Sequence, residues 1–377
     1  MDKTRKKLNK IALFLPSLTG GGAERVFVTL ANSLVEHEIK IDLVLANAFG
    51  NYFSMLSNKI QVIDLKSSSV ILSIPGLIDY LRTEKPDVLL SAVENANTWA
   101  IIAKKLSGTS IPVIITEHST WSQVLSNQPP LKEKALFQIA SSIYPLADKL
   151  VAVSNGIQAD LIETFNINPN KLVCIYNPVV PKNLDFLTAA HVAHPWIADK
   201  NCPVIISVGR LVKVKDYPTL IQAFSLAKKL TNCRLIILGE GPERNALQTL
   251  INQLGLQNDI DLPGFVENPF AWMAKCDLFV LSSLYEGLPT VLIEAMACGT
   301  PVVSTNCISG PAEILENGKY GDLIPLGDVN LLAAALVENV NHPKANSKIK
   351  ERANDFSVNN AADAYIELIK KVINHEE

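Results

Sequence analysis

Short apolar runs alternate with longer segments of helical spacing along this 377-residue chain. Most runs of the first half are uninterrupted and rich in β-branched residues, which is typical of parallel strands covered on both faces. They span residues 11–15, 39–46, 88–91, 113–116, 150–154 and 172–176. The pattern predicts a buried parallel sheet whose strands are connected by helices.

A second series of the same kind begins after residue 200. Its strands are expected at residues 204–208, 234–238, 278–282 and 301–305. Helical spacing lies between them, for example from Tyr217 to Leu230 and from Arg244 to Leu254. A pattern that restarts in this way indicates two doubly wound α/β domains, each Rossmann-like, rather than one large domain.

Several prolines and no sustained period mark the segment between the two series. We predict an N-terminal domain over residues 1–180, a linker over 181–200, a second domain over 201–355 and a C-terminal helix over 356–377. The last helix is amphipathic because Ala362, Tyr365, Ile366 and Ile369 recur at helical spacing. We expect it to pack back toward the N-terminal domain.

Composition narrows the class of partners. With 48% hydrophobic and 19% charged residues the chain is expected to fold around large cores, and a net charge of −3 argues against a nucleic-acid partner. The first 180 residues carry 17 basic and 15 acidic side chains, whereas the remainder carries 17 and 22. The N-terminal half, with its basic run Lys3, Arg5, Lys6, Lys7 and Lys10, is therefore the better candidate for peripheral contact with anionic lipid.

Cysteine usage and hydropathy bear on the compartment. The six cysteines form no CxxC pair, which favours a reducing compartment. The apolar run at residues 11–15 is too short for the core of a signal peptide, and no stretch approaches the ~18 apolar residues of a spanning helix. We expect a cytoplasmic protein that can lie on the inner face of the cytoplasmic membrane.

The segment from Asp277 to Asn306 carries the most informative chemistry. It reads as a strand, a loop with Glu286 and Gly287, a helix from about Thr290 and a second strand. The loop and helix start lie at the carboxyl end of a parallel strand, where such sheets bind phosphate. Glu286 and Glu294 can both face the hydroxyls of one ligand there. Alternatively Glu286 is a turn residue and Glu294 a solvated helix residue, although the helix around Glu294 is otherwise apolar.

This segment resembles the signature of retaining glycosyltransferases of family 4, whose GT-B fold places two Rossmann-like domains across an interdomain cleft. Four more segments match in the same order: GGGAER at Gly20–Arg25, the segment Val208–Phe224, GEGPER at Gly239–Arg244 and GFVENP at Gly264–Pro269. The resemblance spans about residues 11 to 315. Together with SGPAEIL at Ser309–Leu315, it is most similar to bacterial enzymes that extend lipid-linked oligosaccharide or polysaccharide units.

The resemblance implies a donor-binding set of Gly21, Gly22, Arg210, Lys215, Gly264, Val266, Glu286, Gly287, Leu288, Thr290, Val291 and Glu294. In it Arg210 and Lys215 hold the donor diphosphate, Glu294 the ribose and Glu286 the transferred sugar. The loop of residues 264–266, here called the GFV loop, would hold the base through backbone groups, while Phe265 could equally be a core residue. Many relatives have phenylalanine and glycine where this chain has Leu288 and Pro289, and proline removes one N–H donor.

Further residues are implied in the N-terminal domain. The resemblance places His118 near the reacting centre, so the implied catalytic set is His118, Arg210, Lys215 and Glu286. Asn95, Asn97 and Glu117 are implied on the acceptor side. A lone histidine is also common as a structural residue, and ordinary turn chemistry would explain the two asparagines.

Two further patterns are interpreted as structural. Asp259 and Asp261 form a DxD, a metal-binding motif of a different glycosyltransferase fold, but here they are expected to be turn and solvated carboxylates. Gly239 and Gly241 begin a dinucleotide fingerprint in which Arg244 replaces the third glycine. We therefore expect no metal and no nicotinamide, only a nucleotide sugar as substrate.

The sequence as a whole predicts a retaining, metal-independent glycosyltransferase. It would move a hexose or N-acetylhexosamine from a nucleotide sugar, with UDP favoured over GDP, to a glycan or polyprenyl-linked saccharide of the bacterial surface. One alternative is a UDP-N-acetylglucosamine 2-epimerase of the same fold. Another is a catalytically silent GT-B subunit, against which the intact glutamate pair, Arg210 and Lys215 argue.

Overall fold

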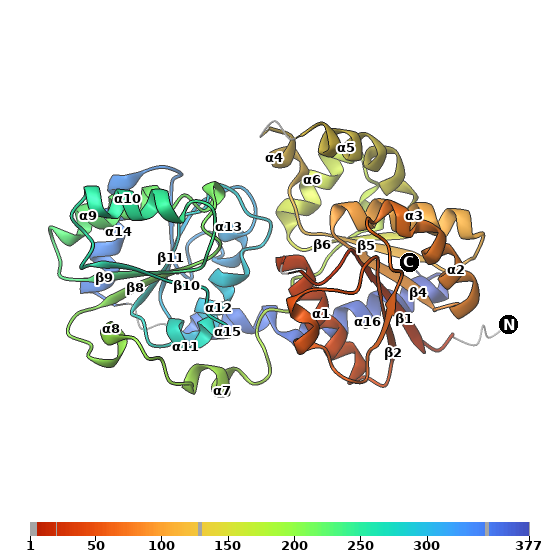
Figure 1. The fold of residues 1–377 in the computed structure, drawn as a ribbon, viewed down its shortest axis with the longest axis horizontal. Coiled ribbons are helices and arrows are strands. Elements are labelled where there is room, and N and C mark those ends of the chain that lie inside the picture. Colours follow the sequence, from red (N-terminus) through yellow and green to blue (C-terminus); the bar gives the residue numbers. More distant parts are fainter. Residues whose placement is uncertain (1–5, 20, 127–129, 344–346, 377) are drawn as a thin grey trace. The chain divides into compact units, whose positions relative to one another are not determined.

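The computed structural model describes residues 6–19, 21–126, 130–343 and 347–376. The chain folds into two compact units (Figure 1). The N-terminal unit comprises Met1–Pro178 together with Val358–Glu377, and the C-terminal unit comprises Val179–Ser357. The last helix therefore returns to the unit in which the chain began.

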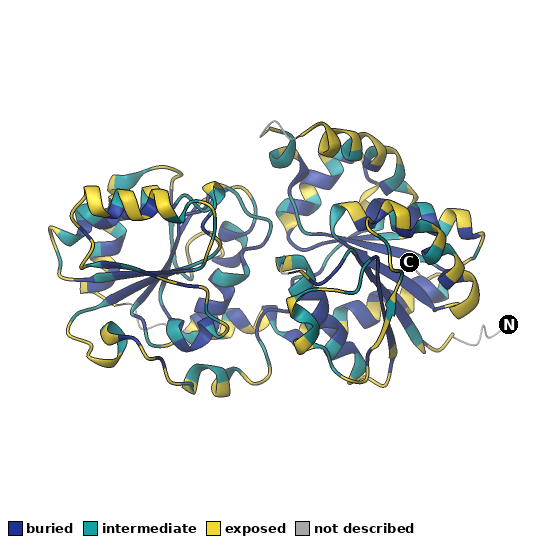
Figure 2. Cartoon of the chain, viewed as in Figure 1, coloured by how far each residue is buried: buried dark blue, intermediate teal, exposed yellow. Residues whose placement is uncertain are grey.

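The N-terminal unit is built on a seven-stranded parallel sheet with the order β3-β2-β1-β4-β5-β6-β7. Its strands are β1 (Lys10–Leu15), β2 (Lys40–Leu45), β3 (Gln61–Asp64), β4 (Val88–Ala92), β5 (Val113–Glu117), β6 (Lys149–Ala152) and β7 (Leu172–Cys174). In β1, Ile11 pairs with Ile41 on one side and Val88 on the other. These central strands are buried on both faces (Figure 2), as their continuous apolar runs predict.

Helices connect these strands, and one helix arrives from the far end of the chain. They are α1 (Gly22–Val35), α2 (Ile74–Glu84), α3 (Glu94–Ser107), α4 (Trp121–Ser126), α5 (Leu131–Ile143), α6 (Asn155–Phe165) and α16 (Val358–Asn374), with 3-10 turns η1 (Asn51–Met55), η2 (Ile71–Ser73), η3 (Tyr144–Leu146) and η4 (Pro169–Lys171). Tyr365 and Ile369 of α16 join the same core as Leu13. The Tyr365 hydroxyl also lies 3.2 Å from Thr116 Oγ1 of β5.

The C-terminal unit repeats this plan with a six-stranded parallel sheet of order β10-β9-β8-β11-β12-β13. Its strands are β8 (Val204–Val208), β9 (Arg234–Leu238), β10 (Ile260–Gly264), β11 (Leu278–Leu281), β12 (Val302–Thr305) and β13 (Asp322–Ile324). Its helices are α7 (Leu184–Ala189), α8 (Pro195–Ala198), α9 (Tyr217–Lys228), α10 (Arg244–Gln253), α11 (Pro269–Met273), α12 (Thr290–Cys298), α13 (Pro311–Ile314), α14 (Val329–Asn341) and α15 (Ser347–Ala353), with η5 (Lys213–Lys215) and η6 (Asn354–Phe356). In both units the strand order reverses at the first strand, and sheets of this type bind ligands at that switch point.

The segment expected to be a linker, residues 181–200, differs from that expectation. It contains α7 and α8 and is held to the C-terminal unit by specific contacts. Lys275 Nζ donates to Thr188 O at 3.0 Å and to Ala190 O at 2.7 Å, and His194 Nε2 lies 2.9 Å from Asp261 Oδ2. These partners lie 67 to 87 residues apart in sequence, so local composition could not reveal them.

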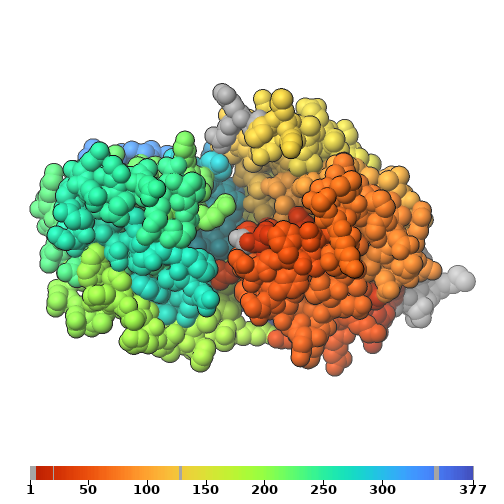
Figure 3. All heavy atoms as spheres, in the orientation of Figure 1, coloured from red at the N-terminus to blue at the C-terminus, as the bar shows by residue number. Residues whose placement is uncertain are grey.

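Three short strands, β3, β10 and β13, were also absent from the predicted set. Each pairs with a single neighbour and none is fully buried, so none has the continuous apolar run that marks the central strands. The helix α5 lies at the surface (yellow in Figure 3), with Leu131 83% exposed, whereas Phe137 packs against Trp121 and Phe165. Within the described residues, a membrane-crossing helix of sufficient length and apolarity was not found.

Candidate functional site

In the C-terminal unit, a lysine and a glutamate meet at the carboxyl ends of two neighbouring strands. Lys215 ends η5, which follows β8, and Glu286 lies in the loop after β11. Lys215 Nζ lies 2.6 Å from Glu286 Oε1, and Ser283 Oγ donates to the same oxygen at 2.6 Å. The two charged side chains are only 18% and 13% exposed, so this ion pair is shielded more than a surface pair.

Two hydrogen bonds to backbone carbonyls hold the two loops of this pair together. Ser282 Oγ donates to Lys215 O at 2.7 Å, and Leu284 N donates to Val214 O at 2.8 Å. Asp216, which follows Lys215 and is the N-cap residue of α9, has a φ of 44° and therefore lies in the left-handed region. A non-glycine residue held there signals a turn that its surroundings determine. These contacts fix the turn at Lys215 and orient the Lys215 side chain toward Glu286.

Arg210 lies in the same loop after β8 but differs in its surroundings. Its side chain is exposed, and none of the described residues pairs with its guanidinium. Two partly buried positions of the predicted donor set, Thr290 and Val291, form the first turn of α12. That helix begins after Pro289 without a side-chain cap, which leaves N–H groups at its positive end for a ligand. Glu294 lies one turn further along and is 2% exposed.

The GFV loop follows β10. Gly264 has a φ of 96°, and its carbonyl accepts a hydrogen bond from Gly239 N at 2.8 Å. Val266 is partly buried, whereas Phe265 is 76% exposed. The alternative that Phe265 is a core residue is therefore wrong.

In the N-terminal unit, His118 lies in the loop between β5 and α4. Its ring meets Phe27 edge-on, with centroids 6.0 Å apart, and its Nε2 is buried with no hydrogen-bond partner among the described residues. Burial lowers the pKa of His118 to about 4. The imidazole is therefore neutral at pH 7 and retains an unused polar atom. Of the glycines before α1, Gly21 caps the helix and Gly22 begins it, while Gly20 lies outside the described residues.

Two buried carboxyl groups hold the His118 loop. Glu117 accepts hydrogen bonds from His118 N at 3.1 Å, Trp121 Nε1 at 3.1 Å and Tyr144 Oη at 2.9 Å. On the other side, Asp160 of α6 accepts from Trp121 N at 2.7 Å. Burial, and to a lesser degree the nearby Glu94, raises the pKa of Glu117 to about 8.

The three residues implied on the acceptor side occupy different environments. Asn95 is exposed and accepts a hydrogen bond from Trp99 Nε1 at 2.8 Å. Asn97 is fully buried and donates to Thr116 O at 2.8 Å, while Glu117 is 1% exposed. In this structure Asn97 and Glu117 therefore support the strand ends from within. Motif comparison did not identify Asp160, Ser283 or the role of Glu117, because each acts through a contact and not through a local pattern.

The two aspartates of the DxD have protein partners. Asp259 Oδ1 lies 2.8 Å from Lys228 Nζ, and Asp261 pairs with His194. Within the described residues, no group of three or more histidine, cysteine, aspartate or glutamate side chains is placed to hold a metal ion. Asp259 and Asp261 thus have structural partners that account for them.

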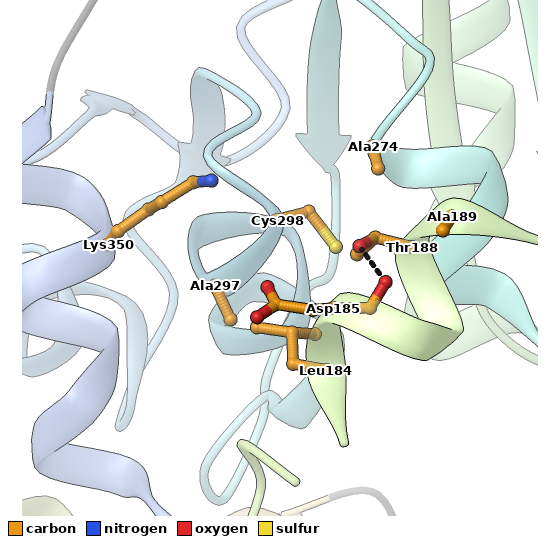
Figure 4. A pocket seen from close by; sticks show the side chains of 8 residues that line it. All are labelled: Leu184, Asp185, Thr188, Ala189, Ala274, Ala297, Cys298 and Lys350. Carbon is orange, nitrogen blue, oxygen red and sulfur yellow. Dashed lines mark hydrogen bonds between the residues drawn. The ribbon is translucent and has the colours of Figure 1, made fainter. Parts of the chain in front are cut away.

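A cavity of about 290 Å³ lies beside the last turn of α12, at the helix end opposite Thr290 (Figure 4). Its walls include Asp185, Thr188, Cys298 and Lys350. Burial raises the pKa of the Cys298 thiol to about 12, so this cysteine is a poor nucleophile near neutral pH. The cavity shares none of the residues of the predicted donor set.

Two Rossmann-like units, one of which carries an ion pair at its strand ends, are typical of nucleotide-binding proteins, and sequence comparison identifies the family. Residues 20–183 match the family described as Glycosyltransferase Family 4, and residues 194–356 match the one described as Glycosyl transferases group 1. A Campylobacter jejuni protein is 31% identical over 357 residues, which cover 92% of this chain and 94% of that protein. The chain therefore belongs to the family 4 glycosyltransferases with the GT-B fold, which confirms the family and fold predicted from the motifs.

That relative is named N-acetylgalactosamine-N,N'-diacetylbacillosaminyl-diphospho-undecaprenol 4-alpha-N-acetylgalactosaminyltransferase. A second Campylobacter jejuni relative, an alpha-1,4-N-acetyl-D-galactosaminyltransferase named for a GalNAc-GalNAc-diNAcBac-PP-undecaprenol substrate, is 28% identical over 97% of this chain and 99% of its own. Among solved structures, Anabaena HepE in complex with UDP-glucose has a TM-score of 0.79 at 21% identity, over 96% of this chain and 99% of that chain.

Proposed function

We propose that this glycosyltransferase moves an N-acetylhexosamine or hexose from a UDP-sugar to a polyprenyl-diphosphate-linked saccharide in bacterial surface-glycan synthesis. The observation that carries the proposal is the Lys215–Glu286–Ser283 cluster at the ends of β8 and β11. The names of the Campylobacter relatives support the acceptor class and an N-acetylated sugar. UDP is the nucleotide bound by HepE, which shares the fold.

The residues of the C-terminal unit suit the departure of a nucleoside diphosphate. Arg210 and Lys215 are cations that can stabilise the negative charge as the bond between the sugar C1 and the phosphate oxygen breaks. The N–H groups at the start of α12 add to this stabilisation. Glu286 then binds hydroxyls of the transferred sugar and Glu294 binds the ribose. The exposed Phe265 is available to contact the base.

We propose that configuration at C1 is retained and that no metal takes part. The acceptor oxygen forms its bond to C1 on the face from which UDP departs with the bonding electrons, and the acceptor proton passes to the departing phosphate. Metal independence is supported by the two cations beside the site and by the protein partners of Asp259 and Asp261. His118, neutral at pH 7, is assigned a hydrogen bond to the transferred sugar.

The proposal is tested by incubating the purified protein with UDP-N-acetylgalactosamine, UDP-N-acetylglucosamine, UDP-glucose or UDP-galactose and a synthetic polyprenyl-diphosphate saccharide. Mass spectrometry should detect addition of one sugar in at least one reaction, and NMR of the product should show the donor's anomeric configuration. Turnover should persist in EDTA. Loss of turnover in EDTA that Mg²⁺ or Mn²⁺ restores would instead assign a metal role to Asp259 and Asp261.

The roles of the two glutamates can be separated by calorimetry and kinetics. Glu294→Ala should weaken UDP binding about 10- to 100-fold, because a charged acceptor of ribose hydroxyls is lost. Glu286→Ala should lower turnover while UDP affinity changes much less. Equal loss of UDP affinity in both variants would contradict the sugar-side assignment of Glu286.

The same assays test the alternatives. Conversion of UDP-N-acetylglucosamine to its 2-epimer without acceptor would identify an epimerase. A chain that binds no nucleotide sugar in a thermal-shift screen would be a silent subunit. The Lys215–Glu286 pair and the exposed Arg210 favour the transferase, because a silent subunit has no need for cations at this site.

A lipid-linked acceptor requires access to a membrane surface, and we propose that the basic N-terminal run contributes. Lys3 and Arg5 lie outside the described residues. Lys6 pairs with Asp87 at 3.0 Å and Lys10 with Glu84 at 2.8 Å, so part of the predicted positive charge is already neutralised. Lys7 is exposed, and its ammonium group pairs with none of the described residues. Attachment through this run is accordingly expected to be weak and sensitive to salt.

A further inference from the structure

The loop that carries Glu286 is paired along its length with a second loop, residues 306–310. Strands β11 and β12 pair in parallel, with Leu281 opposite Ser304. After both strands end, the same register resumes where Tyr285 bridges Ile308. Glu286 N donates to Ile308 O at 3.5 Å, and Ser309 Oγ donates to Gly287 O at 2.8 Å. The Glu286 loop is therefore supported by residues that the predicted donor set does not include.

The supporting loop has an unusual backbone. Ser309 has a φ of 64° and Gly310 a φ of 91°. A side chain at residue 310 would collide with Pro289 Cδ and approach Gly287 O to 3.1 Å, so only glycine fits there. Ser309 could be glycine at less conformational cost, yet it carries a hydroxyl that contacts the Glu286 loop. Backbone strain of this kind persists only where the surrounding structure enforces it.

The contact at Gly287 determines the direction of the next N–H group. In a trans peptide the carbonyl of Gly287 and the N–H of Leu288 point in opposite directions. Because the Gly287 carbonyl accepts a hydrogen bond from Ser309 Oγ, the Leu288 N–H points away from Ser309. In the described part of the chain this N–H has no hydrogen-bond partner. Leu288 itself is 7% exposed, so its peptide lies at a sheltered position before α12.

We infer that Ser309 is a positioning residue, whose hydroxyl orients the Gly287–Leu288 peptide so that the Leu288 N–H and Glu286 face the transferred sugar. The inference rests on the proposed function, because it assigns the Glu286 loop to the donor sugar. It adds a residue from the SGPAEIL segment to the determinants of the reaction. Ser309 acts through Gly287 and touches no substrate.

The test uses two substitutions that differ in backbone strain. Ser309→Gly removes the hydroxyl and also relieves the strain at φ 64°, whereas Ser309→Ala removes the hydroxyl and retains the strain. Both variants should lower kcat about five- to tenfold, the effect of losing one hydrogen bond. UDP affinity should change less than about twofold in both variants, because UDP lacks the transferred sugar that this loop is proposed to contact. The melting temperature should fall only for Ser309→Ala.

A matched control is Asn317→Gly, since Asn317 is exposed and has a φ of 55° in the same unit. It should keep wild-type kcat while relieving similar strain. Amide hydrogen exchange provides a readout independent of turnover: a peptide spanning residues 284–292 should exchange faster in both Ser309 variants and not in the control.

Failure of the inference is distinguishable from failure of the proposed function. If the wild-type protein transfers no sugar, the proposed function is wrong and the inference falls with it. If the wild type is active and Ser309→Gly retains its kcat, or if kcat falls only in proportion to thermal stability, the inference alone is overturned.

Discussion

The loops after β5 and after β11 follow the same structural plan but present different chemistry. In the N-terminal unit, His118 is neutral and its Nε2 is buried, and buried carboxyl groups hold its loop. In the C-terminal unit, the loop after β11, which lies next to the first strand of its sheet as β4 does in the N-terminal unit, carries the Lys215–Glu286 ion pair, held by serine hydroxyls. One strand order therefore supports a sheltered polar site in one unit and a charged site in the other. The difference lies in side chains that only the tertiary fold brings to the strand ends.

The largest effect is expected at the charged site. Lys215→Ala should lower kcat about 10²- to 10³-fold, because it removes a cation from the leaving group and leaves Glu286 without its ammonium partner. Lys213→Ala is the matched control, since Lys213 is exposed two residues away in the same turn, and it should change kcat less than about twofold. Equal kcat values for the two variants would show that the ion pair is only structural.

The buried carboxylate of the N-terminal unit should make stability depend on pH. Burial raises the pKa of Glu117 from 4.5 to about 8, so its contribution to stability is complete below pH 4.5 and is lost as pH rises through 8. Relative to Glu117→Gln, the wild type should lose on the order of 3 kcal/mol in free energy of unfolding between pH 5 and pH 8.5. Urea titrations at both values measure this, and a constant difference would place the pKa near its ordinary value.

The neutral histidine gives a smaller expected effect. His118→Ala should lower kcat about 10- to 100-fold if a hydrogen bond to the sugar is lost. Because the pKa of His118 is lowered to about 4, its charge does not change between pH 6 and pH 9. The pH profile of the wild-type kcat should therefore have no inflection near pH 6.5. An inflection there that is absent from the His118→Gln variant would show that His118 titrates in this range and would contradict the lowered pKa.

The smallest effect concerns the basic run. Replacing Lys3, Arg5 and Lys7 with glutamine should reduce co-sedimentation with anionic vesicles at low salt, each cation contributing about 1 kcal/mol at most. Substitution is preferable to deletion of residues 1–9, because Leu8 is 7% exposed and belongs to the core. Donor hydrolysis should be unaffected. If the variant binds anionic vesicles as well as the wild type does, the basic run has no role in membrane attachment. Uncharged vesicles provide the control.

Much of the fold was predictable because its determinants are local. The central strands are continuous apolar runs, and α12 begins at Thr290, where the sequence predicts it, and stops before the left-handed Gly299. The motif order also identified the family, since its residues recur at recognisable spacings. Short edge strands such as β3 were not predictable in this way, because a partly exposed strand lacks that apolar signal.

The sequence by itself determined two α/β domains, the family and the residue types of the candidate site. Tertiary structure alone decided that Lys215 meets Glu286, 71 residues later, and that Asp160 supports the loop of His118. It also decided that residues 181–200 pack on the C-terminal unit and that α16 returns to the N-terminal one. Apolar periodicity and turn residues act over a few positions of the chain. The contacts that set burial, charge pairing and loop orientation depend instead on strand order, which brings together residues distant in sequence.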